Sequence, residues 1–123
     1  MNGVRMNYRI IEVNNRRLQG KFIKFPRTIY QGNDHWVPPL TLEMRRRLHP
    51  LENPFFRYGT VKLFAALGEK EELVGRCAAI INPVHDELYH DKAGFFGMCE
   101  CIDDIEAARA LMGGVMDELR ANN

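Results

Sequence analysis

The sequence predicts one α/β domain over residues 1–123, with elements in the order strand, helix, helix, three strands, helix. Two observations predict it. Apolar residues recur at helical spacing near both ends of the chain, and two continuous apolar runs flank a short charged turn, as in a hairpin. The composition, 46% hydrophobic and 27% charged, is that of a globular domain that buries a core without disulfide or metal cross-links.

The first half begins with a strand at residues 8–13, which ends at two asparagines. An amphipathic helix follows, and we expect Pro26 to kink or divide it. Its apolar stripe consists of Leu18, Phe22, Phe25 and Ile29, with basic residues between them.

Prolines divide the next segment. Pro38 and Pro39 cannot continue a helix, so residues 33–39 form a loop that carries Trp36. Residues 41–48 read as a helix stopped by Pro50, and residues 53–56 (NPFF) form a second aromatic loop.

The second half contains the hairpin, residues 61–67 and 73–81. A polar connection over residues 85–92 leads to a fourth strand at residues 93–102 and a helix over residues 104–121. Asp103 is the expected N-cap of this helix, with Glu106 completing a capping box. Its expected apolar stripe is Ile105, Ala108, Met112, Val115 and Leu119, and the adjacent Gly113 and Gly114 indicate close packing against the sheet.

Charge is divided unevenly along the chain. Residues 1–62 hold 12 Lys or Arg against 4 Asp or Glu, and residues 63–123 hold 5 against 12. Oppositely charged halves can pack together and neutralise each other, and no nucleic-acid motif is present, so no nucleic-acid partner is expected. No apolar run could span a bilayer, so we expect a cytoplasmic protein with free thiols and no membrane partner.

No metal site is predicted. Cys99 and Cys101 lack the spacing of a thiolate pair and are expected to be small core residues, with Cys77 the third cysteine. His85 and His90, near several acidic residues, would point apart on a helix.

Four sequence words, together with the element order, resemble the GNAT (N-acetyltransferase) superfamily, and in particular a group of little-characterised bacterial GNAT-like proteins. They are NDHWVPPL (33–40), NPFF (53–56), Gly75-Arg76 and GFFGMCECIDD (94–104). The resemblance covers residues 8–121 and implies a mixed, mainly antiparallel sheet. In the superfamily, seven strands splay between the fourth and fifth to hold acetyl-CoA or another acyl-CoA. The last three strands and one helix have no counterpart here. We therefore expect an incomplete GNAT-like domain, which is a fragment of a longer protein, a truncated natural chain or a half-fold completed by another molecule. The unpaired edge of the fourth strand favours pairing, for example with a second copy of the chain.

The resemblance also assigns a cofactor site and a base. The family holds the pyrophosphate on backbone amides at the start of the helix after the fourth strand, which corresponds to Cys101, Ile102 and Asp103. Asp103 and Asp104 place negative charge there, against such binding. Some members carry a glutamate base on the fourth strand, which corresponds to Glu100; alternation would put Phe96, Met98 and Glu100 on one face. Glu100 could instead cap or form a salt bridge.

The expected function is therefore acyl-CoA-dependent N-acyl transfer, for example of acetyl, to a small-molecule or peptide amine, with this chain inactive alone. Trp36, Phe55 and Phe56 could line the acceptor pocket or fill the core under the loops. The alternative is a non-catalytic GNAT-like module whose open sheet edge binds a partner.

Overall fold

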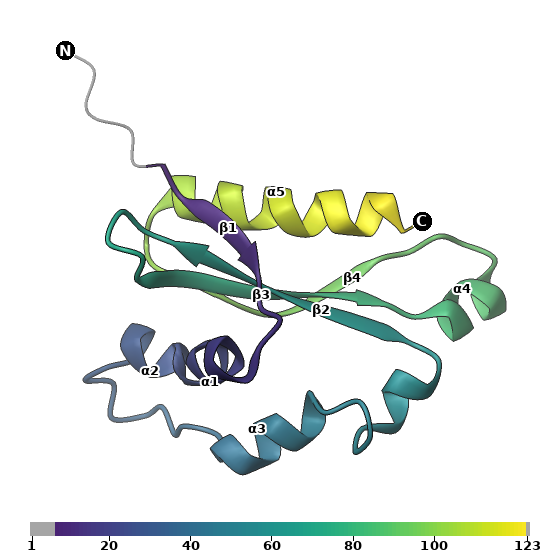
Figure 1. Cartoon of the computed structure of the whole chain (residues 1–123), viewed down its shortest axis with the longest axis horizontal. Coiled ribbons are helices and arrows are strands. Elements are labelled where there is room, and N and C mark those ends of the chain that lie inside the picture. Colours follow the sequence, from purple (N-terminus) through teal and green to yellow (C-terminus); the bar gives the residue numbers. More distant parts are fainter. Residues whose placement is uncertain (1–6, 123) are drawn as a thin grey trace.

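The computed structural model describes residues 7–122, which form one four-stranded antiparallel sheet flanked by helices (Figure 1). The strands lie in sequence order as β1-β2-β3-β4, so each pairs with its neighbour along the chain. The expected hairpin is confirmed as β2 and β3, and every pairing is antiparallel rather than mixed. The strands are β1 (Arg9–Glu12), β2 (Thr60–Leu67), β3 (Leu73–Ile81) and β4 (Phe95–Cys101).

The helices of the first half follow the sequence pattern. Asn15 caps α1 (Arg16–Lys24), its side chain accepting a hydrogen bond from the Leu18 N–H at 2.9 Å. Pro26 then divides the segment as expected, because it begins the short helix α2 (Pro26–Ile29). α3 (Thr41–Arg47) and the 3₁₀ turn η1 (Pro54–Arg57) complete this half.

The prediction of a polar connection over residues 85–92 was wrong in part, because α4 (Pro83–Tyr89) occupies most of it. Asn82 is its N-cap, with its side chain 3.1 Å from the His85 N–H, and Pro83 is the first helical residue. Asn82 and Pro83, which end the preceding strand as predicted, therefore also start a helix.

The last helix, α5 (Ile105–Ala121), lies where the sequence predicts it, but Asp104 caps it rather than Asp103. The Asp104 side chain accepts from the Glu106 N–H at 2.9 Å. Of the five residues expected in its apolar stripe, only Val115 and Leu119 are buried, because Ile105 is 64% exposed and Ala108 and Met112 are half-buried. The buried stripe is Ala107, Leu111, Val115 and Leu119. No helix within residues 7–122 is both long and apolar enough to cross a membrane.

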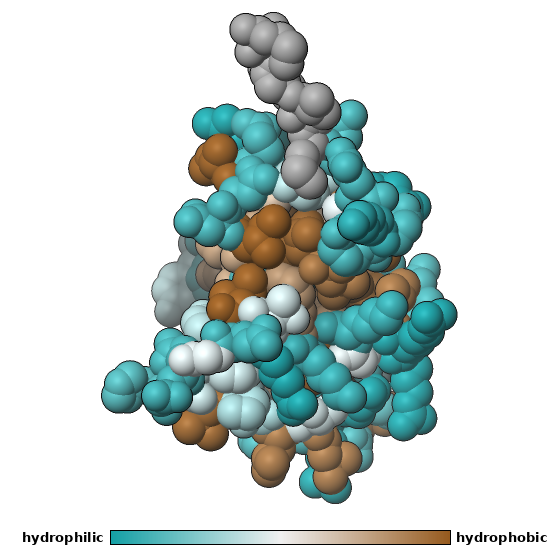
Figure 2. Space-filling view, turned by 90° about the vertical axis from the view of Figure 1, so that its left-hand side faces the viewer, coloured by the Kyte–Doolittle hydropathy of each residue, from teal (hydrophilic) through white to brown (hydrophobic). Residues whose placement is uncertain are grey.

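Two hydrophobic cores lie on opposite faces of the sheet. α5 covers one face, where Leu111 and Val115 are fully buried against β2 and β3. α1 and α3 cover the other, with Phe22 fully buried in a cluster that includes Met44 and Leu63 (Figure 1). Figure 2 shows hydrophobic side chains reaching the surface between hydrophilic regions above and below.

A β-bulge interrupts the pairing of β4 with β3. Arg76 faces Glu100 and Ala78 faces Gly97, so Met98 and Cys99 together oppose the single residue between them. Met98 takes a positive φ of 53°, an uncommon conformation for this residue type. The bulge reverses the alternation, so the expectation that Phe96 shares a face with Glu100 was wrong: Phe96 pairs with Ala79, which lies in the α5 core.

Candidate functional site

The predicted base, Glu100, lies on β4 and is held by Tyr30, the C-cap residue of α2. The Tyr30 hydroxyl donates to Glu100 Oε2 at 3.0 Å and lies 3.3 Å from Oε1. Glu100 and Tyr30 are both half-buried, and 70 positions separate them in the chain. The α2–β4 contact therefore orients a carboxylate that the sequence could only place on a strand.

The turn after α2 brings Trp36 to the same place. Tyr30 ends α2, and Gly32 follows with a φ of 83°, a conformation that glycine adopts without steric cost. The Asn33 side chain then accepts from the His35 N–H at 2.9 Å, which tightens the turn. As a result the Trp36 ring stacks on Tyr30, with centroids 5.1 Å apart and planes 17° from parallel.

Arg76, which the sequence analysis did not single out as a site residue, is the charged neighbour of Glu100. It faces Glu100 across β3 and β4 and is only 7% exposed. Its Nη1 donates to the Phe22 carbonyl at 2.9 Å, near the end of α1, and its guanidinium lies 5.1 Å from the centre of the Phe22 ring. Its Nε has no hydrogen-bond partner within residues 7–122.

The charges in this cluster act on each other. The hydrogen bond to Glu100, and then the charge of that carboxylate, raise the pKa of Tyr30, so the phenol stays a neutral donor. Burial lowers the pKa of Arg76, and the Glu100 carboxylate opposes that effect. Tyr30 and Arg76 therefore hold the Glu100 carboxylate in place beside the β4 bulge, and a carboxylate oriented in this way is a candidate for general-base chemistry.

The start of α5 is occupied by the chain's own carboxylate. Asp104 accepts from the Glu106 N–H, and its other oxygen accepts from the Tyr8 hydroxyl. These hydrogen bonds lower the pKa of Asp104 and raise the pKa of Tyr8 to about 12.

The three residues predicted to hold a pyrophosphate lie just before Asp104. The Cys101 side chain packs against the α5 core, and the Ile102 N–H donates to the Val74 carbonyl at 2.9 Å. Asp103 is exposed. These side chains and the capped helix start do not fit a pyrophosphate, because Asp104 puts negative charge on the amides that would bind it.

Phe55 and Phe56 lie in another part of the fold. The Phe55 ring meets Phe56 and Tyr58 edge to face, and its approach leaves no room for a side chain at Gly59, where an added Cβ would lie 2.2 Å from the ring.

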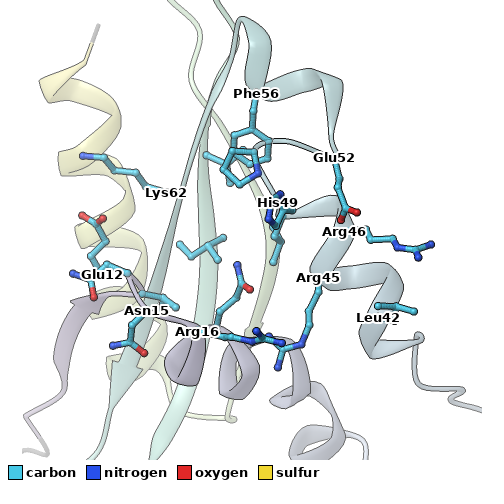
Figure 3. A pocket seen from close by; sticks show the side chains of 17 residues that line it. Glu12, Asn15, Arg16, Leu42, Arg45, Arg46, His49, Glu52, Phe56 and Lys62 are labelled. Carbon is cyan, nitrogen blue, oxygen red and sulfur yellow. The ribbon is translucent and has the colours of Figure 1, made fainter.

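Phe56 lines a groove with Arg16, Arg45 and Lys62 (Figure 3). This groove lies against β1 and β2, whereas Glu100 lies on β4 with β3 between them. Of the three predicted acceptor residues, the structure brings only Trp36 to the cluster around Glu100.

One group of possible metal ligands is present within residues 7–122. His85, Asp86 and Asp91 each offer a ligand atom, and these atoms lie within 4.8 Å of one another. His85 Nδ1 lies 3.3 Å from Asp91 Oδ1 and 3.7 Å from Asp86 Oδ1. The three cysteines are free, but Cys99 is exposed rather than in the core.

Comparison with known proteins gives two relatives. The chain is 37% identical over 95 residues to Protein YghO of Escherichia coli K12, a match that covers 75% of this chain and 23% of that protein. It is 32% identical over 102 residues to Bacterial ceramide synthase of Caulobacter vibrioides, covering 82% of this chain and 26% of that protein. The chain thus spans about a quarter of the length of these relatives. No family model and no solved structure matches it.

Proposed function

We propose that this chain is the acceptor-side part of an acyl-CoA-dependent N-acyltransferase of the GNAT type, with Glu100 as the general base. The observation that carries the proposal is the Glu100 carboxylate, oriented by Tyr30, beside the β4 bulge. Bulges are over-represented next to active sites, where they redirect side chains. The element order contains the one expected from the sequence, with the additional helix α4 between β3 and β4.

In the proposed reaction, the acceptor amine attacks the thioester carbonyl of the donor. A C–N bond forms, the C–S bond breaks, and the thiolate leaves, while Glu100 takes the proton from the amine. Tyr30 is a positioning residue, because it holds the carboxylate.

The name of one relative supports amide formation. A ceramide is an amide between a fatty acid and a long-chain amino alcohol, so a ceramide synthase forms a bond to an amine nitrogen. We therefore place a long-chain amino alcohol beside small-molecule and peptide amines among the acceptors to be tested. The stacked Trp36 and Tyr30 rings offer an apolar wall near Glu100.

Asp104 favours a second candidate, a non-catalytic binding or interaction module. Its carboxylate caps the start of α5, where the resemblance would place the pyrophosphate. β4 pairs only with β3 among the described residues, so its other edge could pair with a partner strand or a second copy.

Calorimetric titration of the 123-residue chain with acetyl-CoA and with a long-chain acyl-CoA distinguishes the two candidates. Saturable binding would have to lie away from the start of α5, which Asp104 caps. Together with transfer to an amine that Glu100→Gln abolishes without weakening donor binding, it is the result expected for the acyltransferase. Glu87→Gln is the control, since Glu87 is an exposed glutamate on α4, outside both the cluster and the start of α5. No binding up to millimolar donor would favour the module.

A further inference from the structure

A histidine and two aspartates lie together at the end of the sheet that carries α4 (Figure 1). His85 and Asp86 belong to the first turn of α4, and Asp91 follows two residues after the helix ends. His90, the C-cap residue, has a positive φ of 55° and turns the chain, and the Asp91 N–H donates to the Asp86 carbonyl at 3.3 Å. The turn thus brings the Asp91 carboxylate to the His85 ring.

Neighbouring groups hold these side chains in position. The His85 ring lies 4.6 Å from the Tyr89 ring, and Phe95 of β4 meets it edge to face at 5.0 Å. Asp86 Oδ1 accepts a hydrogen bond from the Ala93 N–H at 3.1 Å. In metal sites, outer contacts of this kind orient the ligands and are part of the affinity. The three side chains are therefore ordered by the fold itself.

The His85 Nδ1 atom is the observation that points to a ligand. It is buried and has no hydrogen-bond partner within residues 7–122. It lies 3.3 Å from an Asp91 oxygen and 3.7 Å from an Asp86 oxygen, but neither contact is a hydrogen bond. Carboxylates only accept, so a neutral imidazole would direct its Nδ1 lone pair at two further acceptors. A cation bound between the three groups satisfies them all, because each then donates a lone pair to it.

The spacing of the three donor atoms suits a tetrahedral ion. Zinc binds histidine nitrogen at about 2.0 to 2.1 Å and carboxylate oxygen at about 2.0 to 2.2 Å, so two of its ligands lie about 3.4 Å apart. The observed separations of 3.3 and 3.7 Å are close to this value, and all three atoms lie within 4.8 Å of one another. Octahedral magnesium, with bonds of about 2.0 to 2.1 Å, would need neighbouring ligands about 3.0 Å apart.

We propose that His85, Asp86 and Asp91 bind a zinc ion. Two carboxylates carry the charge that a divalent cation balances, and no lysine or arginine within residues 7–122 forms an ion pair with either of them. One nitrogen and two oxygens favour zinc over magnesium or calcium, which prefer oxygen alone. The Asp91 side chain is 46% exposed, so water can reach the ion and complete the tetrahedron.

The ion would join the start of α4 to the connection that leads into β4. Its place is beside Phe95, at the opposite end of β4 from Glu100, so its role is to stabilise this end of the sheet. The proposal departs from the expectation that the chain binds no metal. It is independent of the proposed acyl transfer, because none of its three ligands belongs to the cluster around Glu100.

Calorimetric titration of the chelator-treated 123-residue chain with zinc chloride tests the site. We expect one saturable site, and a Tm that rises with zinc concentration, since the ion binds the folded state. Magnesium chloride should have neither effect. Cobalt(II) in place of zinc should give the visible absorption of a tetrahedral site. The spectrum should lack a thiolate charge-transfer band, because the three free cysteines are not among the proposed ligands.

Matched variants identify the ligands. His85→Gln and Asp91→Asn should each weaken zinc binding about 100-fold or more, since even partners that only orient ligands contribute about 10- to 100-fold. Asp91→Asn leaves the aromatic packing of His85 intact, so it separates a lost ligand from a disturbed fold. The controls His90→Gln and Asp103→Asn change exposed residues of the same types outside the site and should bind zinc as the wild type does.

Three results would overturn the proposal. The first is no saturable zinc binding by the folded wild-type chain up to millimolar zinc, which would leave His85 and the aspartates as an ion pair. The second is binding that persists in Asp91→Asn or is lost equally in the control variants. The third is a cobalt spectrum with a thiolate band, which would assign the metal to the cysteines.

Discussion

The two adjacent glycines of α5 should respond oppositely to alanine. An added Cβ at Gly113 has no neighbour within 4 Å, so Gly113→Ala should gain the helix propensity difference of about 1 kcal/mol. At Gly114 the Cβ would lie 2.9 Å from Ile10 Cγ2 on β1. Overpacking of this kind costs about 1 to 3 kcal/mol. Gly114→Ala should therefore be neutral to about 2 kcal/mol destabilising.

Urea denaturation followed by circular dichroism measures both free energies of unfolding. The two variants should differ by about 1 to 3 kcal/mol, and Gly113→Ala should raise Tm by roughly 4 °C for a domain of this size. In an Ile10→Ala background the contact is gone, so Gly114→Ala should stabilise the chain as Gly113→Ala does. Equal stabilisation by both substitutions in the wild-type background would refute the argument that α5 packs tightly on β1 at Gly114.

Three further predictions concern titratable groups and the core. Because the hydrogen bond to Asp104 raises the pKa of Tyr8 to about 12, the stability that this bond contributes is lost as the pH rises from 10 toward 12. Because the same bond lowers the pKa of Asp104, its contribution is also lost when Asp104 is protonated in acid. Urea titrations should show both losses, and Tyr8→Phe should remove them. Glu100→Gln should lower the titration midpoint of one tyrosine, that of Tyr30, in ultraviolet absorbance, and an unchanged midpoint would contradict the hydrogen bond. Burial raises the pKa of Cys77 to about 12, so Ellman's reagent should modify the exposed Cys99 quickly and Cys77 only on unfolding. The folded Cys77→Ala variant should therefore have the same number of rapidly modified thiols as the wild type, and one fewer would contradict the prediction.

Some residues of the candidate site could be predicted from the sequence and others could not. Glu100 could be placed on a strand from the local pattern and the resemblance, and Trp36 in a loop from the following prolines. The position of Arg76 could also have been predicted, since a single arginine inside the apolar run 73–81 indicates a buried side chain that needs a partner. The contact of Tyr30 with Glu100 could not have been predicted, because nothing in the local spacing connects the end of α2 to a strand 70 positions later.

The sequence by itself determined most elements of this protein and many of their boundaries. Periodicity, prolines and caps act over a few residues, so the hairpin, the division at Pro26 and the extent of α5 could all be predicted. Only the tertiary structure decided the bulge in β4, the choice of Asp104 over Asp103 as cap, and the cluster of Tyr30, Glu100 and Arg76. Each of these depends on how two segments that are distant in the chain pack together, and the free energy of that contact cannot be predicted from either segment alone.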